Sequence, residues 1–298
     1  MSSDLKQKVL EFISFYAAMG RATSLMEIKT RAPISNKITI TDILDVLSVL
    51  NKKGDIAFKD GFYTTRERIA LLESRTTQDF NLDKKWERLL RGAQWFHHIP
   101  FIDFAAVSGS ISFGAIRSSS DFDIILGVKK GRIFTARYFA SALFSLLRIR
   151  RLDDLEASSP NKFCFNHIVT PSTYEKEPHN YYRYELYRHM IPIFINGNSF
   201  NDFIEMNKWA NISPLNIEHA KETLRHPSKI KKYIESILDG RIGNYIEQYI
   251  ARPIATKRLS NYINQKQTRG RVVVSDEELE FHFSLNYEEQ FSHFLIEK

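Results

Sequence analysis

Two aspartates separated by one residue are the side chains in this sequence best suited to chemistry. Asp121 and Asp123 stand at the start of the apolar run 124–128, which is typical of a buried strand. Side chains two positions apart in a strand share a face, so both carboxylates project in the same direction. Neighbouring carboxylates repel each other unless a cation lies between them, and Mg²⁺ with oxygen ligands is the usual one. The pattern therefore predicts a divalent-metal site.

A glycine and a serine upstream complement the acid pair. Gly109 and Ser110 follow the apolar run 101–107, which predicts a first strand ending in a tight turn and a short helix. Glycine lets the backbone approach a phosphate closely, and Ser110 adds a hydroxyl and an N–H group at the start of the helix. A phosphate-binding turn beside a metal-binding acid pair indicates phosphoryl or nucleotidyl transfer.

The segment from Gly109-Ser110 to Ser120-Asp121-Phe122-Asp123 resembles the signature of the DNA polymerase β-like nucleotidyltransferase superfamily. The resemblance spans roughly residues 80–195. It implies that Gly109, Ser110 and Ser120 bind a nucleoside triphosphate. It also implies that Asp121 and Asp123 hold Mg²⁺ or Mn²⁺. The activity that it implies is transfer of a nucleoside monophosphate, most simply AMP from ATP, to an unknown acceptor.

The superfamily pattern includes a third acidic residue on a later strand, and here the sequence departs from it. The expected strand covers residues 162–169, and Asn166 stands where the third carboxylate belongs. An amide oxygen is a weak ligand for Mg²⁺ and a poor base. Other groups that could substitute are His167, expected on the opposite strand face from Asn166, Glu185 on a following helix, and Asp153, Asp154 and Glu156 before the strand.

The missing carboxylate leaves more than one function open. The first is a Mg²⁺-dependent nucleotidyltransferase whose acceptor is a small molecule, a nucleic acid or a protein. The alternative is a catalytically weak or inactive protein of the same fold that binds nucleotide or nucleic acid through its N-terminal part. A third is the modification of a partner protein in the manner of antitoxin-like nucleotidyltransferases.

The N-terminal range 1–75 predicts three helices followed by a β-hairpin that turns at Asp60-Gly61. This order resembles a winged helix-turn-helix. The third helix, which would enter a DNA groove, has Asp42 and Asp45 at outward positions where DNA-binding helices usually have cationic or amide side chains. Protein docking or substrate positioning is therefore as well supported as DNA binding.

The predicted fold class is α+β: a nucleotidyltransferase-type mixed sheet with helices over residues 76–197, between the winged helix and a mainly helical domain over residues 198–298. Helices are expected at 200–210, 216–224 and 228–251, and an extended segment at 272–276. No internal repeats, low-complexity tracts or long linkers are found.

Composition and charge narrow the class of protein to which the chain can belong. It has 298 residues, a net charge of +7 and one cysteine, Cys164, which excludes an intramolecular disulfide. The basic clusters at 229–232 and 269–271 are the candidates for contacts with nucleic-acid phosphates. No apolar run reaches membrane-spanning length, and the first residues lack a signal-peptide layout. We expect a cytoplasmic protein without a membrane partner, and its oligomeric state is left open.

Overall fold

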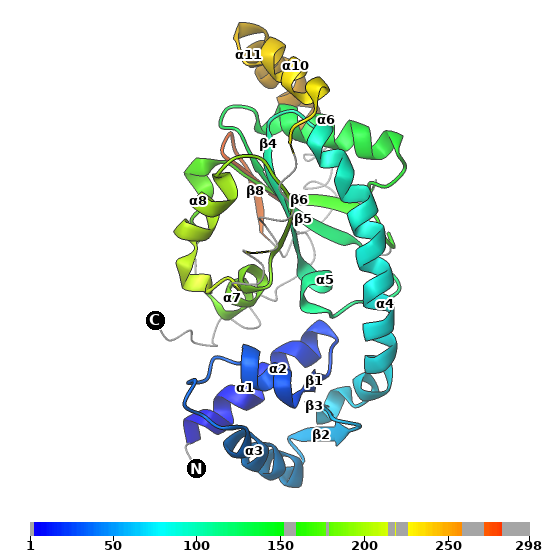
Figure 1. Cartoon of the computed structure of the whole chain (residues 1–298), viewed down its shortest axis with the longest axis vertical. Helices are drawn as coiled ribbons and strands as arrows, with labels where there is room; N and C mark the ends of the chain where they lie inside the picture. Colours follow the sequence, from blue (N-terminus) through cyan, green and yellow to red (C-terminus); the bar gives the residue numbers. More distant parts are fainter. Residues whose placement is uncertain are drawn as a thin grey trace. The chain divides into compact units, whose positions relative to one another are not determined.

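The computed structural model describes residues 3–151, 159–176, 179–213, 218, 226–257 and 271–281. Within them the chain is α+β, with a mixed six-stranded sheet and a small antiparallel sheet (Figure 1). It divides into two compact units: Met1–Lys84 with Gly114–Arg117, and Lys85–Phe113 with Ser118–Lys298. The predicted ranges 76–197 and 198–298 fall largely in the second unit. The helix expected at 216–224 lies outside the described residues, save for position 218.

The first unit consists of helices and the small sheet. Two of its helices begin with reciprocal capping boxes, Ser24 with Glu27 and Thr39 with Asp42, which satisfy backbone N–H groups at the helix start. The expected hairpin is confirmed, with Asp60-Gly61 in the left-handed region at its turn. The elements are α1 (Ser3–Met19), β1 (Thr23–Ser24), α2 (Leu25–Arg31), α3 (Ile40–Lys53), β2 (Ile56–Lys59), β3 (Phe62–Thr65) and η1 (Arg66–Arg68), with sheet order β1-β3-β2.

A buried ion network holds the first unit together. The Glu27 carboxylate accepts hydrogen bonds from Arg21 at 3.0 Å and from Arg75 at 3.1 Å, and these two cations hold the pKa of Glu27 below its usual value although burial alone would raise it. Arg21 also donates to the carbonyl oxygen of Gly114 at 2.6 Å. This contact attaches the short segment 114–117, which follows the Gly109-Ser110 turn, to the N-terminal elements.

The second unit is built on the six-stranded sheet, whose order is β7-β4-β5-β6-β9-β8. The pair β5 and β6 is parallel, and every other neighbouring pair is antiparallel. The strands are β4 (Ile102–Ser108), β5 (Phe122–Val128), β6 (Phe163–Val169), β7 (Ile191–Ile195), β8 (Val272–Val274) and β9 (Glu278–Phe281).

Helices cover both faces of this sheet, and aromatic side chains form the contacts. On one face Phe144 packs on Phe163, with ring centroids 4.8 Å apart. On the other face Phe104 packs on Phe200 at 5.2 Å. The helical elements of the unit are α5 (Gly109–Phe113), α6 (Ile133–Leu146), α7 (Tyr181–Arg188), α8 (Ser199–Met206), α10 (Lys229–Leu238), α11 (Arg241–Ile246), the short segments η2 (Gln94–His98), η3 (Pro171–Thr173) and η4 (Lys208–Ala210), and the π-helical η5 (Glu247–Ala251). The long helix α4 (Ala70–Ala93) contributes residues to both units.

Candidate functional site

The acid pair lies where β5 begins. The ladder starts with Phe122, whose N–H donates to the carbonyl oxygen of Lys162 at 2.8 Å, so Asp121 immediately precedes the strand and Asp123 is its second residue. Both aspartates are partly buried. One ligand atom from each of Asp121, Asp123 and Cys164 lies within 4.8 Å of the others. The structure thus brings the two predicted carboxylates together and adds a thiol.

Gly109 lies directly against the acid pair. Ser108, the last residue of β4, pairs with Asp123 across the antiparallel ladder, and the chain turns at Gly109 with φ of +69°. A Cβ atom at this position would come within 2.5 Å of Asp123 Oδ2. Both the backbone conformation and the close approach therefore require glycine here. Ser110 follows in α5 and is partly buried.

Asn166 contacts the acid pair directly. Its amide Nδ2 donates to Asp123 Oδ1 at 3.1 Å. Cys164 is the residue of β6 that pairs with Asp123 in the parallel ladder. An amide and a buried thiol therefore stand beside Asp123 on β6, and neither is a strong ligand for Mg²⁺, which prefers charged or carbonyl oxygens.

Two cations at the site were not indicated by motif spacing. Arg151 forms an ion pair with Asp121 at 2.6 Å. Lys85, at the end of α4 that belongs to the second unit, donates to the carbonyl oxygen of Ser120 at 2.7 Å and to Asn161 Oδ1 at 3.1 Å. Lys85 thus fixes the turn that carries Ser120 into the acid pair. Arg151 lies 30 residues from its partner, and the sequence offers no periodicity or motif that joins the two.

The electrostatics differ between the two aspartates. Burial and the neighbouring Asp121 carboxylate raise the pKa of Asp123 to about 8, against the smaller opposing effects of Arg151 and the Asn166 hydrogen bond. The negative charge of Asp123 is therefore poorly compensated by the groups around it. A cation bound at this point would remove that cost.

The expectation that His167 faces away from Asn166 is wrong, and a β-bulge is the reason. Asp123 pairs with Cys164, but Ile125 pairs with His167, so β6 carries one extra residue over this stretch. Paired residues point to the same face, and Asp123 and Ile125 share a face because they are two positions apart. His167 therefore lies on the same sheet face as Asp123. Regular alternation, which the sequence expectation assumed, ends at the bulge.

This face continues into a second, buried charged cluster on β6 and β9. His167 Nε2 lies 3.0 Å from Glu278 Oε1, and Lys176 Nζ donates to the same oxygen at 2.5 Å. Arg271 forms an ion pair with Glu280 at 2.6 Å. These surrounding donors lower the pKa of Glu278 to about 2, although burial alone would raise it. The cluster already contains its own cations and is a structural element.

The remaining substitutes for the third acid do not add a carboxylate at Asp123 in the part of the chain that the structure describes. Glu185 is fully buried on α7, where Oε2 lies 3.2 Å from His189 Nε2. Asp153, Asp154 and Glu156 lie outside the described residues. Asn166 is thus the predicted third-position residue that the structure brings into hydrogen-bonding contact with the acid pair.

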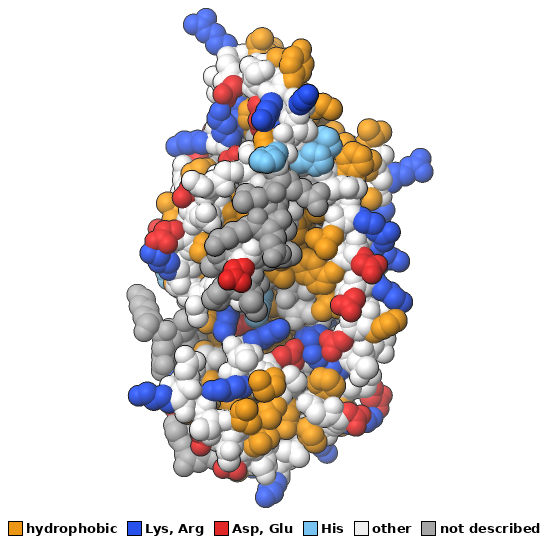
Figure 2. Space-filling view, viewed as in Figure 1, with side chains coloured by type: hydrophobic (Ala, Val, Ile, Leu, Met, Phe, Trp, Pro, Cys, Tyr) orange, Lys and Arg blue, Asp and Glu red, His pale blue; other side chains and the backbone are white. Residues whose placement is uncertain are grey.

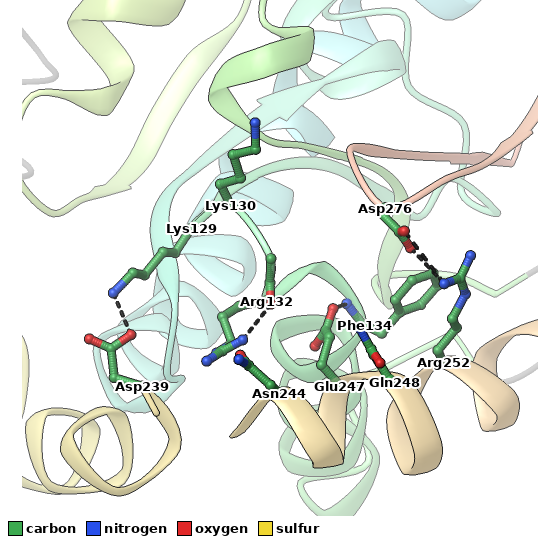
Figure 3. A pocket seen from close by; sticks show the side chains of 11 residues that line it. Lys129, Lys130, Arg132, Phe134, Asp239, Asn244, Glu247, Gln248, Arg252 and Asp276 are labelled. Atoms are coloured by element: carbon green, nitrogen blue, oxygen red, sulfur yellow. Dashed lines mark hydrogen bonds and ion pairs between the residues drawn. The ribbon is translucent and has the colours of Figure 1, made fainter. Parts of the chain in front are cut away.

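A separate pocket of about 400 Å³ lies between the start of α6 and the helices α11 and η5 (Figure 3). Several cations line it, but they are paired within the fold: Lys129 with Asp239 at 2.6 Å, and Arg252 with Asp276 at 3.2 Å. Arg132 donates to the carbonyl oxygen of Leu238 at 3.1 Å. We interpret the pocket as part of the packing contact that attaches these helices to the sheet.

Comparison with known proteins gives no relative: no protein-family profile, curated protein or solved structure matches the chain. Among the described residues, no helix has both the length and the apolar composition needed to cross a membrane.

Proposed function

We propose that this chain is a divalent-metal-dependent nucleotidyltransferase of the DNA polymerase β-like superfamily. The observation that carries the proposal is the contact of Gly109 with Asp123, where a Cβ atom would come within 2.5 Å of the carboxylate. The glycine-serine turn thus lies against the acid pair. It follows one strand and is joined to the next strand, which carries Asp123, by a short helix. The α+β fold and the β4–β5 pairing agree with this arrangement.

The acid pair is suited to Mg²⁺ or Mn²⁺. Mg²⁺ in nucleotide enzymes is held by one or two carboxylates together with substrate phosphates and water, so Asp121 and Asp123 are a sufficient protein contribution. Their ligand atoms are close enough to share one ion, and the poorly compensated charge of Asp123 favours a cation. Bound metal would offset the charge on the triphosphate and on the leaving pyrophosphate.

In the proposed reaction the acceptor oxygen attacks the α-phosphorus of the nucleotide, and the bond to the bridging oxygen breaks to release pyrophosphate. Gly109 would allow close approach of a phosphate to the backbone, while Ser110 and Ser120 would donate hydrogen bonds to it. Lys85 would hold Ser120 in place through its carbonyl oxygen. Asn166 is neutral and accepts no proton, so it would orient Asp123 and would not act as the base.

The N-terminal unit supports an accessory role in this function. Three helices with a two-stranded hairpin and a short third strand agree with the winged helix that the sequence predicts. The exposed side of α3 carries Asp42 and Asp45 together with Ile40 and Leu44, which are 43% and 42% exposed. Apolar and acidic side chains suit a protein surface better than a DNA groove. We therefore propose that this unit positions a protein, or an acceptor bound to a protein.

A second candidate function is a nucleotide-binding protein of the same fold with little or no transfer activity. Two contacts favour it: Asn166 donates to Asp123, and Arg151 pairs with Asp121. Both carboxylates therefore already have protein partners, and the third carboxylate of the superfamily pattern is absent.

One experiment separates the two functions. The full chain is incubated with each α-³²P-labelled nucleoside triphosphate and Mg²⁺ or Mn²⁺, alone and with cellular RNA or protein, and pyrophosphate release is followed in parallel. Nucleotidyl transfer predicts label or pyrophosphate from the wild type and none from Asp121→Ala. Asn166→Asp should raise the rate, because it supplies the missing carboxylate. Metal-dependent nucleotide binding without any release in both the wild type and Asn166→Asp would favour the binding protein.

A further inference from the structure

The helix α10 exposes three of its large apolar side chains, while Leu238 at its end is buried. Ile230, Tyr233 and Ile237 are 60%, 68% and 44% exposed. Their spacing of three and four residues puts them on one side of the helix. An amphipathic helix of a globular protein normally turns such a stripe toward the core. Here it is turned toward solvent.

The polar side of α10 attaches the helix to the sheet. Lys231 is fully buried and donates to the carbonyl oxygen of Ile102. Glu235 accepts a hydrogen bond from the N–H group of Phe101 at 2.6 Å. Within the basic cluster 229–232, a candidate for phosphate contacts, Lys231 is therefore buried and points into the fold. Polar contacts fix this helix to the fold, and its apolar stripe is not needed for that purpose.

The next helix repeats the arrangement. Ile242, Tyr245 and Tyr249 on α11 and η5 are 60%, 60% and 65% exposed. Glu247 points inward instead, and its two carboxylate oxygens each accept a backbone N–H group at the start of α6 at 2.8 Å, from Phe134 and Thr135 (Figure 3). A carboxylate at this position also interacts favourably with the positive end of the α6 dipole.

This similarity is present in the sequence. Residues 230–237 read IKKYIESI and residues 242–249 read IGNYIEQY, with Ile, Tyr, Ile and Glu at the same positions in both. In both segments the glutamate accepts hydrogen bonds from backbone N–H groups of the second unit. The first isoleucine and the tyrosine of each segment are exposed.

We call the exposed large side chains of these two successive helical segments the outer face: Ile230, Tyr233, Ile237, Ile242, Tyr245 and Tyr249. Exposed Lys229, Lys232 and Arg241 lie beside these residues in the sequence. Over residues 228–257 the one acidic side chain that is more than partly exposed is Asp239, and it is paired with Lys129. Figure 2 shows hydrophobic and basic side chains together where α10 and α11 lie. Basic side chains therefore outnumber acidic ones among the exposed residues of these helices.

These features decide which partner fits. A second copy docked through this face would bring cations against cations, with little acidic charge to balance them. The surface lies on helices at the end of the second unit away from α5 and α7 (Figure 1). Exposed apolar side chains with flanking lysines and arginines match an anionic lipid surface, and tyrosine is favoured at such interfaces because its ring is apolar and its tip is polar.

We propose that the outer face binds the surface of anionic membranes peripherally. Isoleucine and tyrosine side chains enter the interface, while Lys229, Lys232 and Arg241 interact with lipid phosphates. This inference is independent of the proposed transferase activity, because it rests on α10 and α11 alone.

The test is co-sedimentation of the full chain with vesicles of phosphatidylcholine, with and without about one quarter phosphatidylglycerol. We expect binding to the anionic vesicles and a loss of about tenfold or more for Tyr233→Ser with Tyr245→Ser, because each buried ring contributes to partitioning. Lys232→Gln should weaken binding by about fivefold, since each basic residue near such a surface contributes about 1 kcal/mol. Leu146→Ser is the matched control, because Leu146 is an apolar side chain of the same unit that is 80% exposed outside the outer face.

A second variant tests the proposal without depending on a loss of binding, which misfolding could also cause. Tyr245→Trp keeps an aromatic ring at the surface, and its fluorescence should shift to the blue when anionic vesicles are added. Absence of binding by the wild type, or equal binding to neutral and anionic vesicles, would overturn the proposal. So would a dimer in light scattering that Tyr233→Ser dissociates, which would assign the outer face to a second copy.

Discussion

Two carboxylates on the same face of the central sheet, the buried Glu278 and the partly buried Asp123, differ in how their charge is balanced. Glu278 is surrounded by Lys176, His167 and Arg271, and its pKa falls to about 2. Asp123 has a second carboxylate beside it and an amide as its hydrogen-bond partner, and its pKa rises to about 8. The comparison distinguishes a carboxylate whose charge is balanced by neighbouring cations from one whose charge is poorly compensated.

The largest effect is expected from removing the charge of Glu278. Glu278→Gln leaves Lys176 without its counter-ion in a buried place, whereas Arg271 keeps its ion pair with Glu280. Breaking a buried ion pair from one side typically costs about 3–5 kcal/mol. We therefore expect the free energy of unfolding, measured by urea denaturation, to fall by this amount.

A double variant tests whether the loss of stability comes from the unpaired buried charge. Glu278→Leu combined with Lys176→Met removes both buried charges and should recover most of the lost stability. If Glu278→Gln unfolds at the same urea concentration as the wild type, the cluster is not a stabilising ion pair and the comparison fails.

Removing the charge of Asp123 should raise the free energy of unfolding, whereas removing that of Glu278 lowers it. Asp123→Asn removes a charge that burial and Asp121 disfavour. Removing unfavourable charge at a functional site commonly raises the free energy of unfolding by about 0.5–2 kcal/mol, at the expense of function. Urea denaturation at pH 7.5 without divalent metal is the measurement, and a destabilised variant would contradict the account.

Much of this arrangement follows from the sequence. Apolar runs around Gly109 and Asp123 predict the two strands and the turn between them, and the later run predicts β6 with Asn166 near the acid pair. The bulge in β6 could not be predicted, because no residue type marks the extra position, and His167 was therefore assigned to the wrong face.

Contacts between residues far apart in the sequence could not be predicted either. Lys85 and Arg151 reach the site only through the packing of α4 and the start of β6. For α10, helical spacing indicates an amphipathic helix but not which side faces the sheet. Lys231 and Glu235 are satisfied by backbone groups of β4 and the turn before it, and no local pattern indicates those partners.

The pH dependence of stability should separate the two carboxylates. Glu278 has a lowered pKa, so its contribution is fully present above about pH 4.5 and is lost as the pH falls toward 2. Asp123 has a raised pKa, so without metal the native state loses stability as the pH rises from about 4 to 8. Glu278→Gln should flatten the acidic limb of the unfolding curve and Asp123→Asn the limb toward pH 8. Curves that keep both slopes in both variants would refute the assignment.

The smallest effect is expected at Arg151. Its ion pair with Asp121 is partly open to solvent, at 21% and 16% exposure, and we expect it to contribute about 1 kcal/mol, the upper end of the range for exposed pairs. Arg151→Gln should therefore strengthen binding of Mn²⁺ by no more than about fivefold, because the guanidinium no longer competes for Asp121. Isothermal titration measures the change, and Arg241→Gln on α11 is the control of equal charge. Weaker Mn²⁺ binding by Arg151→Gln would mean that the arginine does not compete with the metal.

The most direct test of the central claim is Mn²⁺ binding followed by the electron paramagnetic resonance signal of the free ion, with and without ATP. We predict one site in the wild type that tightens with ATP and is lost in Asp123→Asn. The double variant Glu278→Leu with Lys176→Met, which alters only the second cluster, should keep it. Affinity should rise by about tenfold per pH unit up to pH 8, as the proton leaves Asp123. Equal Mn²⁺ binding by the wild type and Asp123→Asn, or none by either, would contradict the account.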